Sequence, residues 1–139
     1  MTGTVRQAQG QVTIRRLEEP GDLGWAVLAN GELYAQEYGW DTSYEALVAR
    51  IVADYANDHD AEREAAWIAE AGGQRVGCVF CVADGESTAR LRLLLVHPSA
   101  RGLGAGSRLV RTCMDFAREA GYARMVLWTN DILVAARRI

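Results

Sequence analysis

The sequence has few cysteines, little net charge and no long apolar run, and each shortage excludes a class of protein. Three cysteines are an odd number and follow no export signal, which argues against a disulfide framework. A net charge of −3 gives no reason to expect nucleic acid or an anionic membrane as a partner. No apolar run approaches the roughly 18 residues that span a bilayer. Met1 to Gln11 lacks the apolar core of a signal peptide, so we expect a cytoplasmic protein.

A metal site is not expected either, although Cys78-Val79-Phe80-Cys81 has the spacing C-x-x-C. Residues three apart on a strand point to opposite faces, so the two thiols should diverge. No second pair of Cys or His is present to complete a zinc site. We predict that both cysteines fill the core, as does Cys113 on the apolar face of a later helix.

The composition is that of one ordinary globular domain. The 139 residues suffice for a single hydrophobic core, and 50% of them are apolar while 24% are charged. Residues 1–10 are small and polar. We therefore predict a disordered tail over residues 1–10 and one domain over residues 11–139.

Hydrophobic periodicity predicts an α/β (α+β) fold with the order β-α-α-β-β-β-α-β-α. The expected strands are Gln11–Leu17, Ala65–Ala71, Arg75–Ala83, Thr88–His97 and Arg124–Thr129. The expected helices are Leu23–Tyr38, Tyr44–Asn57, Leu103–Ala120 and a last one that starts at Thr129–Asp131. Asp22 is a candidate N-cap of the first helix, Thr42 or Ser43 of the second, and Gly121 ends the third.

A glycine-rich turn, Arg101-Gly102-Leu103-Gly104-Ala105-Gly106-Ser107, joins the fourth strand to the third helix. The first N–H groups of a helix have no intrahelical partner and carry the positive end of its dipole. Glycines let an anion approach that backbone without meeting a Cβ atom. The spacing fits neither a dinucleotide fingerprint nor a nucleoside-triphosphate P-loop. The turn therefore suits a phosphate or pyrophosphate, and a turn without a ligand is the alternative.

In its context, this turn resembles the acyl-CoA pyrophosphate loop, Arg/Gln-x-x-Gly-x-Gly/Ala, of the GNAT family of N-acetyltransferases. A strand ending Val96-His97-Pro98 precedes it, and an amphipathic helix and a further strand follow. The order of elements over residues 11–139 is also that of the family. Within the family, the sequence is most similar to acetyltransferase domains found alone or fused behind a MarR-type winged helix. The segments that support this similarity are Glu37–Trp40, Ala65–Glu70 and Leu127–Asn130.

The resemblance implies transfer of an acetyl group from acetyl-CoA, as cosubstrate, to a primary amine of a small molecule or protein. The backbone amides expected to cradle the pyrophosphate are those of Gly102, Leu103, Gly104, Ala105, Gly106 and Ser107. Arg101 either contacts a phosphate or is a solvated loop charge. Leu95 and Val96 would hydrogen-bond the pantetheine arm like a neighbouring strand, and an N–H group near Val96 would hold the oxyanion. Asn130 either contacts the cofactor or serves only as a turn or cap residue.

The attacking amine must lose a proton, and two residues are candidates for the base. Many family members carry a glutamate on the fourth strand, where this sequence has Arg90 and Arg92. His97 is the nearest titratable group to the thioester and has an ordinary pKa of about 6.5, the alternative being a half-exposed side chain at a strand end. Glu37, at the junction of the first two helices, would deprotonate or orient the amine, the alternative being a solvated charge.

The end of the chain departs from the family pattern. Members usually continue to a tyrosine that protonates the leaving thiolate, then to Gly-Phe and a final hairpin, whereas this sequence stops at Ile139. We therefore expect a truncated domain without the general acid and final hairpin, whose fifth strand has an unpaired edge that a homodimer would cover. Two functions stay open: an N-acetyltransferase, or an acyl-CoA-binding pseudoenzyme or interaction module without turnover.

Overall fold

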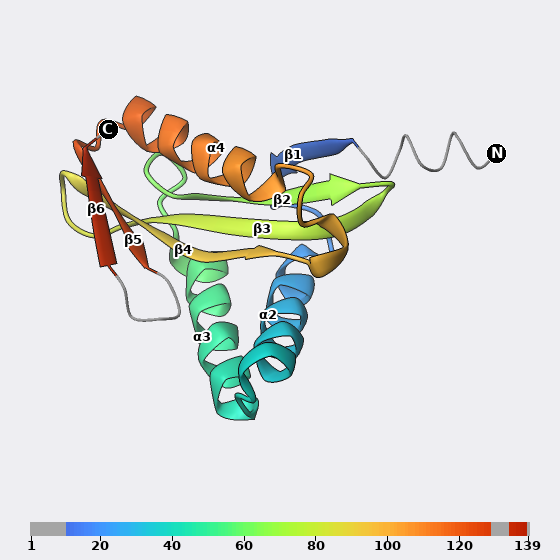
Figure 1. The fold of residues 1–139 in the computed structure, drawn as a ribbon. Coiled ribbons are helices and arrows are strands. Elements are labelled where there is room, and N and C mark those ends of the chain that lie inside the picture. Colours follow the sequence, from blue (N-terminus) through green and yellow to red (C-terminus); the bar gives the residue numbers. More distant parts are fainter. Residues whose placement is uncertain (1–10, 129–133, 139) are drawn as a thin grey trace.

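The computed structural model describes residues 11–128 and 134–138, which build one six-stranded sheet with helices on both faces (Figure 1). The strands are β1 (Val12–Arg16), β2 (Ala65–Ala71), β3 (Gln74–Ala83), β4 (Thr88–Val96), β5 (Arg124–Trp128) and β6 (Val134–Arg138). The helices are α2 (Asp22–Tyr38), α3 (Thr42–Asp58) and α4 (Ala105–Glu119), with a 3-10 turn at Pro98–Ala100. The predicted mixed sheet flanked by helices is confirmed. The predicted tail, residues 1–10, lies outside the described residues.

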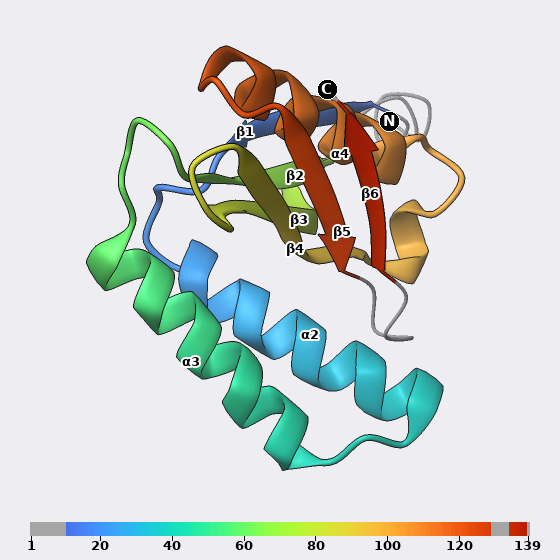
Figure 2. The same cartoon turned by 90° about the vertical axis from the view of Figure 1, so that its left-hand side faces the viewer.

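The strands lie in the order of the sequence, and buried side chains pack on both faces of the sheet. Among the described strands, only β4 and β5 run parallel; the other neighbouring strands are antiparallel. Helix α4 covers one face, while α2 and α3 cover the other (Figures 1 and 2). Because alternate side chains point to opposite faces, Trp67 packs in the cluster under α4 and Ile68 in the cluster under α2 and α3.

The cysteines follow the same alternation. Cys78 belongs to the cluster under α2 and α3, and Cys81 to the cluster under α4, so the predicted divergence of the two thiols is confirmed. Both are buried and free, as is Cys113 on α4. The three thiols are therefore parts of the core, as expected.

The predicted fourth helix is wrong where the structure describes it. Val134–Arg138 forms strand β6, which pairs antiparallel with β5 from Trp128↔Val134 to Arg124↔Arg138. Strand β5 therefore has a partner on each side, β4 and β6, instead of an open edge. The reason for expecting a homodimer at that edge is removed, and the order of strands and α-helices becomes β-α-α-β-β-β-α-β-β.

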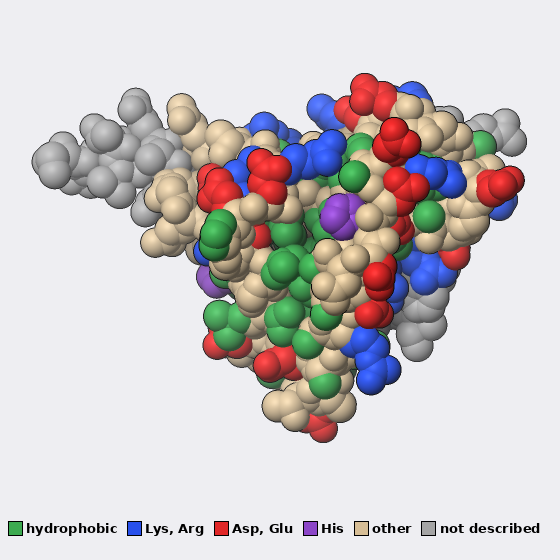
Figure 3. Space-filling model, turned by 180° about the vertical axis from the view of Figure 1, so that it is seen from behind, with side chains coloured by type: hydrophobic (Ala, Val, Ile, Leu, Met, Phe, Trp, Pro, Cys, Tyr) green, Lys and Arg blue, Asp and Glu red, His purple; other side chains and the backbone are tan. Residues whose placement is uncertain are grey.

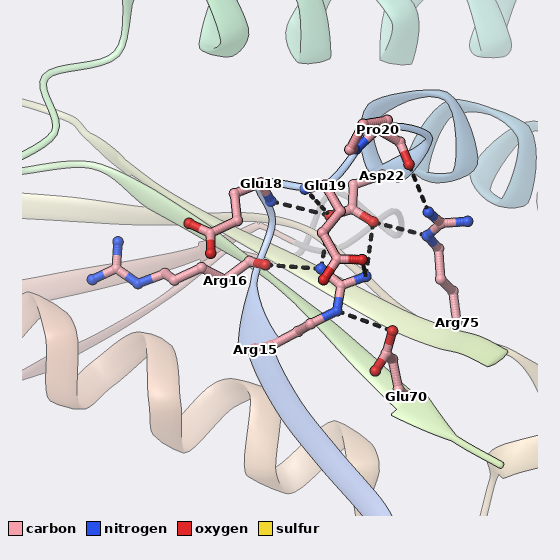
Figure 4. A network of polar contacts seen from close by, with 8 residues as sticks. All are labelled: Arg15, Arg16, Glu18, Glu19, Pro20, Asp22, Glu70 and Arg75. Carbon is pink, nitrogen blue, oxygen red and sulfur yellow. Dashed lines mark hydrogen bonds and ion pairs between the residues drawn. The ribbon is translucent and has the colours of Figure 1, made fainter. Parts of the chain in front are cut away.

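The start of α2 is fixed to the sheet by a buried carboxylate (Figure 4). Asp22 is completely buried, and its oxygens lie 2.8 Å from Arg15 Nη1 and 2.8 Å from Arg75 Nε. Burial alone would raise the pKa of Asp22, but hydrogen bonds from Arg15, the Glu19 amide and Arg75 hold it well below its usual range. Asp22 is thus the first helical residue after Gly21 and an anchor, rather than the predicted N-cap.

Helices α2 and α3 form an antiparallel hairpin and approach each other closely at Gly31. A Cβ atom on Gly31 would lie 2.7 Å from Oε1 of Glu45 on α3. The second helix begins at Thr42, and Asp41 is its N-cap, because the Asp41 carboxylate accepts a hydrogen bond from the Ser43 amide at 2.9 Å. The hairpin thus ends in a capped, tight turn.

The outer surface of this hairpin is partly apolar. Seen from behind, hydrophobic side chains gather in the middle of the helical face, and charged side chains surround them (Figure 3). Exposed large apolar residues of α2 and α3 include Leu23, Leu28 and Leu47. Within residues 11–128, no helix combines the length and apolar character needed to cross a membrane.

Candidate functional site

A bulge in β4 opens the sheet beside the glycine-rich turn. The register of β3 against β4 shifts between Cys78 and Phe80, which leaves β4 with one extra residue. Leu93 in the bulge has a φ of 54°, a conformation that costs a non-glycine residue roughly 1–2 kcal/mol. Pairing between β4 and β5 ends at Leu91, and beyond it the two strands separate (Figure 1). A bulge bends its strand, so this one accounts for the separation.

The separated end of β4 offers backbone groups to a ligand. The His97 amide donates to Val76 O on β3 at 2.7 Å. Alternate residues of an antiparallel strand direct their N–H and C=O groups to opposite neighbours, so Val96 directs its groups away from β3. Among the described residues, β5 pairs with β4 only as far as Leu91 and does not reach Val96 on that side. These backbone groups of Val96 therefore point to where a further strand, or an extended ligand, would lie.

The glycine-rich turn leads into α4 as predicted, with a later helix start. Gly102 and Gly104 have φ values of 90° and 81°, and α4 begins at Ala105 instead of Leu103. The Leu103 amide donates to Ala100 O at 3.2 Å, so that predicted anion donor already has a partner. The amides of Ala105, Gly106 and Ser107 stand in the first turn of α4, where no intrahelical acceptor exists.

Two hollows meet at the separated end of β4. A cavity of about 230 Å³ is lined by Leu33, Tyr34, Glu37, Leu94, Leu95, Val96 and Arg101. A more open hollow of about 610 Å³ follows α4 and is lined by Leu94, Gly106, Ser107, Val110, Arg111, Met114, Asp115 and Arg118. The first includes residues of α2 and the second residues of α4, and Leu94 borders both. A ligand lying along α4 would therefore reach the cavity across the edge of β4.

The two predicted charges of the site form an ion pair with each other. Nη2 of Arg101 lies 2.9 and 3.0 Å from the two carboxylate oxygens of Glu37. The hydrogen bond to Glu37 raises the pKa of Arg101 above its ordinary value. The structure thus joins two candidates that are 64 residues apart in sequence.

Tyr34 is a lining residue that the sequence interpretation missed. It lies three residues before Glu37, on the same side of α2, and stacks on Tyr38 with ring centroids 5.6 Å apart. Burial, with smaller contributions from Tyr38 and Glu37, raises the pKa of Tyr34 to about 12. Its phenol is therefore a hydrogen-bond donor throughout the neutral range. The i, i+3 spacing from Glu37 was the available signal.

His97 faces its own turn. Its Nδ1 caps the 3-10 turn by accepting a hydrogen bond from the Ser99 amide at 3.1 Å, and it lies 2.8 Å from the Ser99 hydroxyl. In this arrangement the basic lone pair of the neutral ring is already engaged. His97 is exposed, and it is not among the residues that line the cavity. Its role as base stays a prediction.

Two neighbours of Glu37 line a different hollow, and one predicted residue lies outside the described residues. Trp40 and Asp41 line a separate hollow of about 490 Å³ at the turn between α2 and α3. Asn130 lies outside the described residues. Over residues 11–128 and 134–138, no three His, Cys, Asp or Glu side chains gather in a way that could hold a metal ion.

Comparison with known sequences and structures defines the class. The family model described as the acetyltransferase (GNAT) family matches residues 17–138. An uncharacterised N-acetyltransferase of Schizosaccharomyces pombe is 30% identical over 132 residues, which cover 92% of this chain and 78% of that protein. The chain therefore belongs to the GNAT family of acetyltransferases.

Other relatives are longer. N-acetyltransferase family 8 member 2 of Rattus norvegicus is 35% identical over 97 residues, 66% of this chain and 41% of that protein. The chain thus spans about two fifths of the length of that curated relative.

Solved structures share the fold. A GNAT acetyltransferase of Brucella melitensis, in complex with acetyl-CoA, superposes with a TM-score of 0.67 at 20% identity, covering 87% of this chain and 77% of that one. An acetyltransferase of Streptococcus agalactiae gives a TM-score of 0.64 at 23% identity, with 84% and 71% covered. At these identities the likeness concerns the fold.

Proposed function

We propose that this chain transfers the acetyl group of acetyl-CoA to a primary amine of a small molecule or protein. The observation that carries the proposal is the separated end of β4, which places open backbone groups at Val96 beside the first turn of α4. The Brucella melitensis neighbour was solved in complex with acetyl-CoA, which supports the same cosubstrate here.

The donor would lie across the edge of β4. Its pyrophosphate would sit on the amides of Ala105, Gly106 and Ser107, where the helix dipole favours an anion. Its pantetheine arm would extend along Leu95 and Val96, because strand-like pairing suits an amide-bearing chain. The N–H group of Val96 would then polarise the thioester carbonyl and stabilise the oxyanion of the tetrahedral intermediate.

The acceptor would enter from the α2 side, through the cavity that Glu37 lines. The amine nitrogen attacks the thioester carbon, forming the amide bond and breaking the carbon–sulfur bond, and one proton must pass from nitrogen to the departing thiolate. Glu37 is better placed than His97 to orient or deprotonate the amine, because it lines the cavity. We also propose that the phenol of Tyr34, which lines the same cavity, donates a hydrogen bond to the negative charge that develops during acetyl transfer.

We also propose a compartment for the protein and a group of related domains within the family. Three free, buried cysteines suit a reducing compartment such as the cytoplasm. Within the family, the phrases Glu37–Trp40 and Ala65–Glu70 favour the acetyltransferase domains related to MarR-type regulators.

The proposal is tested by titrating CoA and acetyl-CoA calorimetrically, then measuring thiol release with a panel of amines. The sequence contains no lysine, so acetylation of the protein's own side-chain amines adds no background. Gly106→Ala is the matched probe: its Cβ atom would meet only Val96 Cγ2, at an ordinary 3.5 Å, yet would lie where the pyrophosphate approaches. Gly24→Ala, with nothing within 4 Å, is the control.

We expect wild type and Gly24→Ala to bind CoA alike and Gly106→Ala to bind it at least about tenfold more weakly, since a close backbone contact is lost. Binding together with amine-dependent thiol release supports the enzyme. Binding without thiol release across the panel favours an acyl-CoA-binding module. Absence of CoA binding overturns both.

A further inference from the structure

The ion pair between Glu37 and Arg101 connects the acceptor side of the site with the donor side. Glu37 ends the α2 side of the cavity, and Arg101 stands immediately before the glycine-rich turn that leads into α4. One guanidinium nitrogen, Nη2, contacts both carboxylate oxygens at 2.9 and 3.0 Å. In this arrangement Glu37 and Arg101 neutralise each other, so neither charge is available to bind a substrate.

This ion pair contributes little to the stability of the fold, so another charged partner can replace either member. The side chains of Arg101 and Glu37 are 52% and 34% exposed, respectively, and exposed ion pairs contribute little to stability. Two carboxylate oxygens share one nitrogen, so the parallel two-nitrogen geometry that makes Arg–carboxylate pairs strong is not used. The buried pairs of Asp22, by contrast, involve a carboxylate that solvent does not reach.

A pyrophosphate bound at the start of α4 would be a stronger partner for Arg101 than Glu37 is. It carries more charge than one carboxylate, and the planar guanidinium matches phosphate oxygens well. The amides of Ala105 to Ser107 would hold the anion in place, so Arg101 would only need to turn toward it.

We infer that Glu37 and the CoA pyrophosphate compete for Arg101, and this inference rests on the donor site of the proposed function. Binding of acyl-CoA turns Arg101 away from α2 and frees the Glu37 carboxylate in the cavity. The acceptor that this carboxylate selects is a cationic amine, and the aromatic ring of Tyr34, which lines the same cavity, also favours a cation. Donor and acceptor are thereby coupled, because the acceptor's ion partner becomes available once the donor is bound.

The inference is tested by a double-mutant cycle on CoA binding, measured by calorimetry at constant ionic strength. The four proteins are wild type, Glu37→Gln, Arg101→Gln and the double variant. Glu32→Gln is the matched control, because it removes the same charge from an exposed position of the same helix. Pantetheine, which has the same arm without phosphates, is the second probe.

Glu37→Gln should bind CoA about two- to fivefold more tightly than wild type, the factor that corresponds to releasing an exposed ion pair. Arg101→Gln should bind CoA more weakly, and adding Glu37→Gln to it should change nothing. Glu32→Gln should match wild type, and pantetheine should bind all five proteins alike.

Three results would overturn the competition while leaving the proposed function intact. These are unchanged CoA affinity in Glu37→Gln, equal tightening in Glu32→Gln, and equal tightening in the Arg101→Gln background. In each, CoA still binds the wild type. If CoA binds none of the proteins, the donor site itself is refuted, and the competition falls with it.

Discussion

The thiol of Cys78 donates a hydrogen bond to the carbonyl oxygen of Leu93, with Sγ 3.3 Å from the oxygen. Cys78 is completely buried on β3, and Leu93 is the bulge residue with positive φ on β4. Burial, slightly offset by a hydrogen bond from Asn30, raises the pKa of Cys78 to about 12, so the thiol keeps its proton. This contact fixes the bulge from inside the core.

Removing that thiol should affect the donor site as well as stability. We expect Cys78→Ala to lower the free energy of unfolding by about 1–2 kcal/mol and to weaken CoA binding severalfold, because the bulge loses its internal partner. Cys81→Ala, an equally buried cysteine on the other face, should destabilise similarly without changing CoA affinity. Urea unfolding and calorimetry measure the two effects. Equal CoA affinity in both variants would contradict the role given to Cys78.

A methyl group at Gly77 should displace the strand that carries the site. Its Cβ atom would lie 2.8 Å from Leu95 O and 3.1 Å from Leu109 Cδ1, and a backbone carbonyl cannot move aside alone. We expect Gly77→Ala to cost about 1–3 kcal/mol in unfolding free energy and to weaken CoA binding. Gly106→Ala, whose Cβ atom meets only an ordinary contact, should retain wild-type stability in the same urea series.

Replacement of the buried carboxylate should be the most destabilising single change. Asp22→Asn leaves Arg15 and Arg75 without their shared partner, and breaking a buried pair costs about 3–5 kcal/mol. Glu19→Gln, which removes a 59% exposed partner 3.6 Å from Arg15, should change the unfolding free energy by less than about 0.5 kcal/mol. Similar values for the two variants would show that the network of Figure 4 is not the anchor of α2.

Asp22 should also make the fold sensitive to acid. Its folded-state pKa is lowered, so its contribution is complete above the unfolded value of about 3.9 and is lost as the pH falls through the folded pKa. We expect the unfolding free energy of wild type to decline below about pH 4, by up to about 1.4 kcal/mol per pH unit from this group. Asp22→Asn should show a shallower decline in urea unfolding between pH 2 and 5. If the unfolding free energies of wild type and Asp22→Asn decline in parallel with falling pH, other carboxylates cause the acid sensitivity.

His97 can be tested by a substitution that preserves its structural contact. An asparagine can accept the Ser99 amide as an N-cap but cannot act as a base. If capping is the main role of His97, His97→Asn should keep thiol release within about threefold of wild type, whereas loss of a general base lowers rates by about 10²–10⁴-fold. A loss of that size at unchanged stability would restore His97 as the base.

The elements that carry the donor site could be predicted from local signals. Apolar runs bounded by turn residues place β2, β3 and β4 almost to the residue, and glycine spacing finds the turn before α4. Strand β6 could not be found in this way, because Val134–Arg138 is rich in alanine and arginine, which have little strand preference. Its pairing with β5 determines its structure.

The arrangement within the site depends on contacts between distant parts of the chain. Nothing in the residue type of Leu93 indicates a positive φ, which the register shift against β3 imposes. Glu37 and Arg101 were both candidates, but their pairing across 64 residues follows from the packing of α2 beside β4. The i, i+3 spacing, by contrast, places Tyr34 on the same side of α2 as Glu37, so its position beside the cavity follows from the helix alone.

The sheet also divides the molecule into parts that can be engineered separately. The cluster under α4 supports the donor side, while the α2–α3 hairpin packs on the opposite face through its own cluster. Side chains on the cavity-facing side of α2 can therefore be exchanged to change which amine is accepted, with the cosubstrate cradle left as it is. A library confined to Leu33 and Tyr34, with the coupled pair of Glu37 and Arg101 retained, would explore acceptor preference from a few positions.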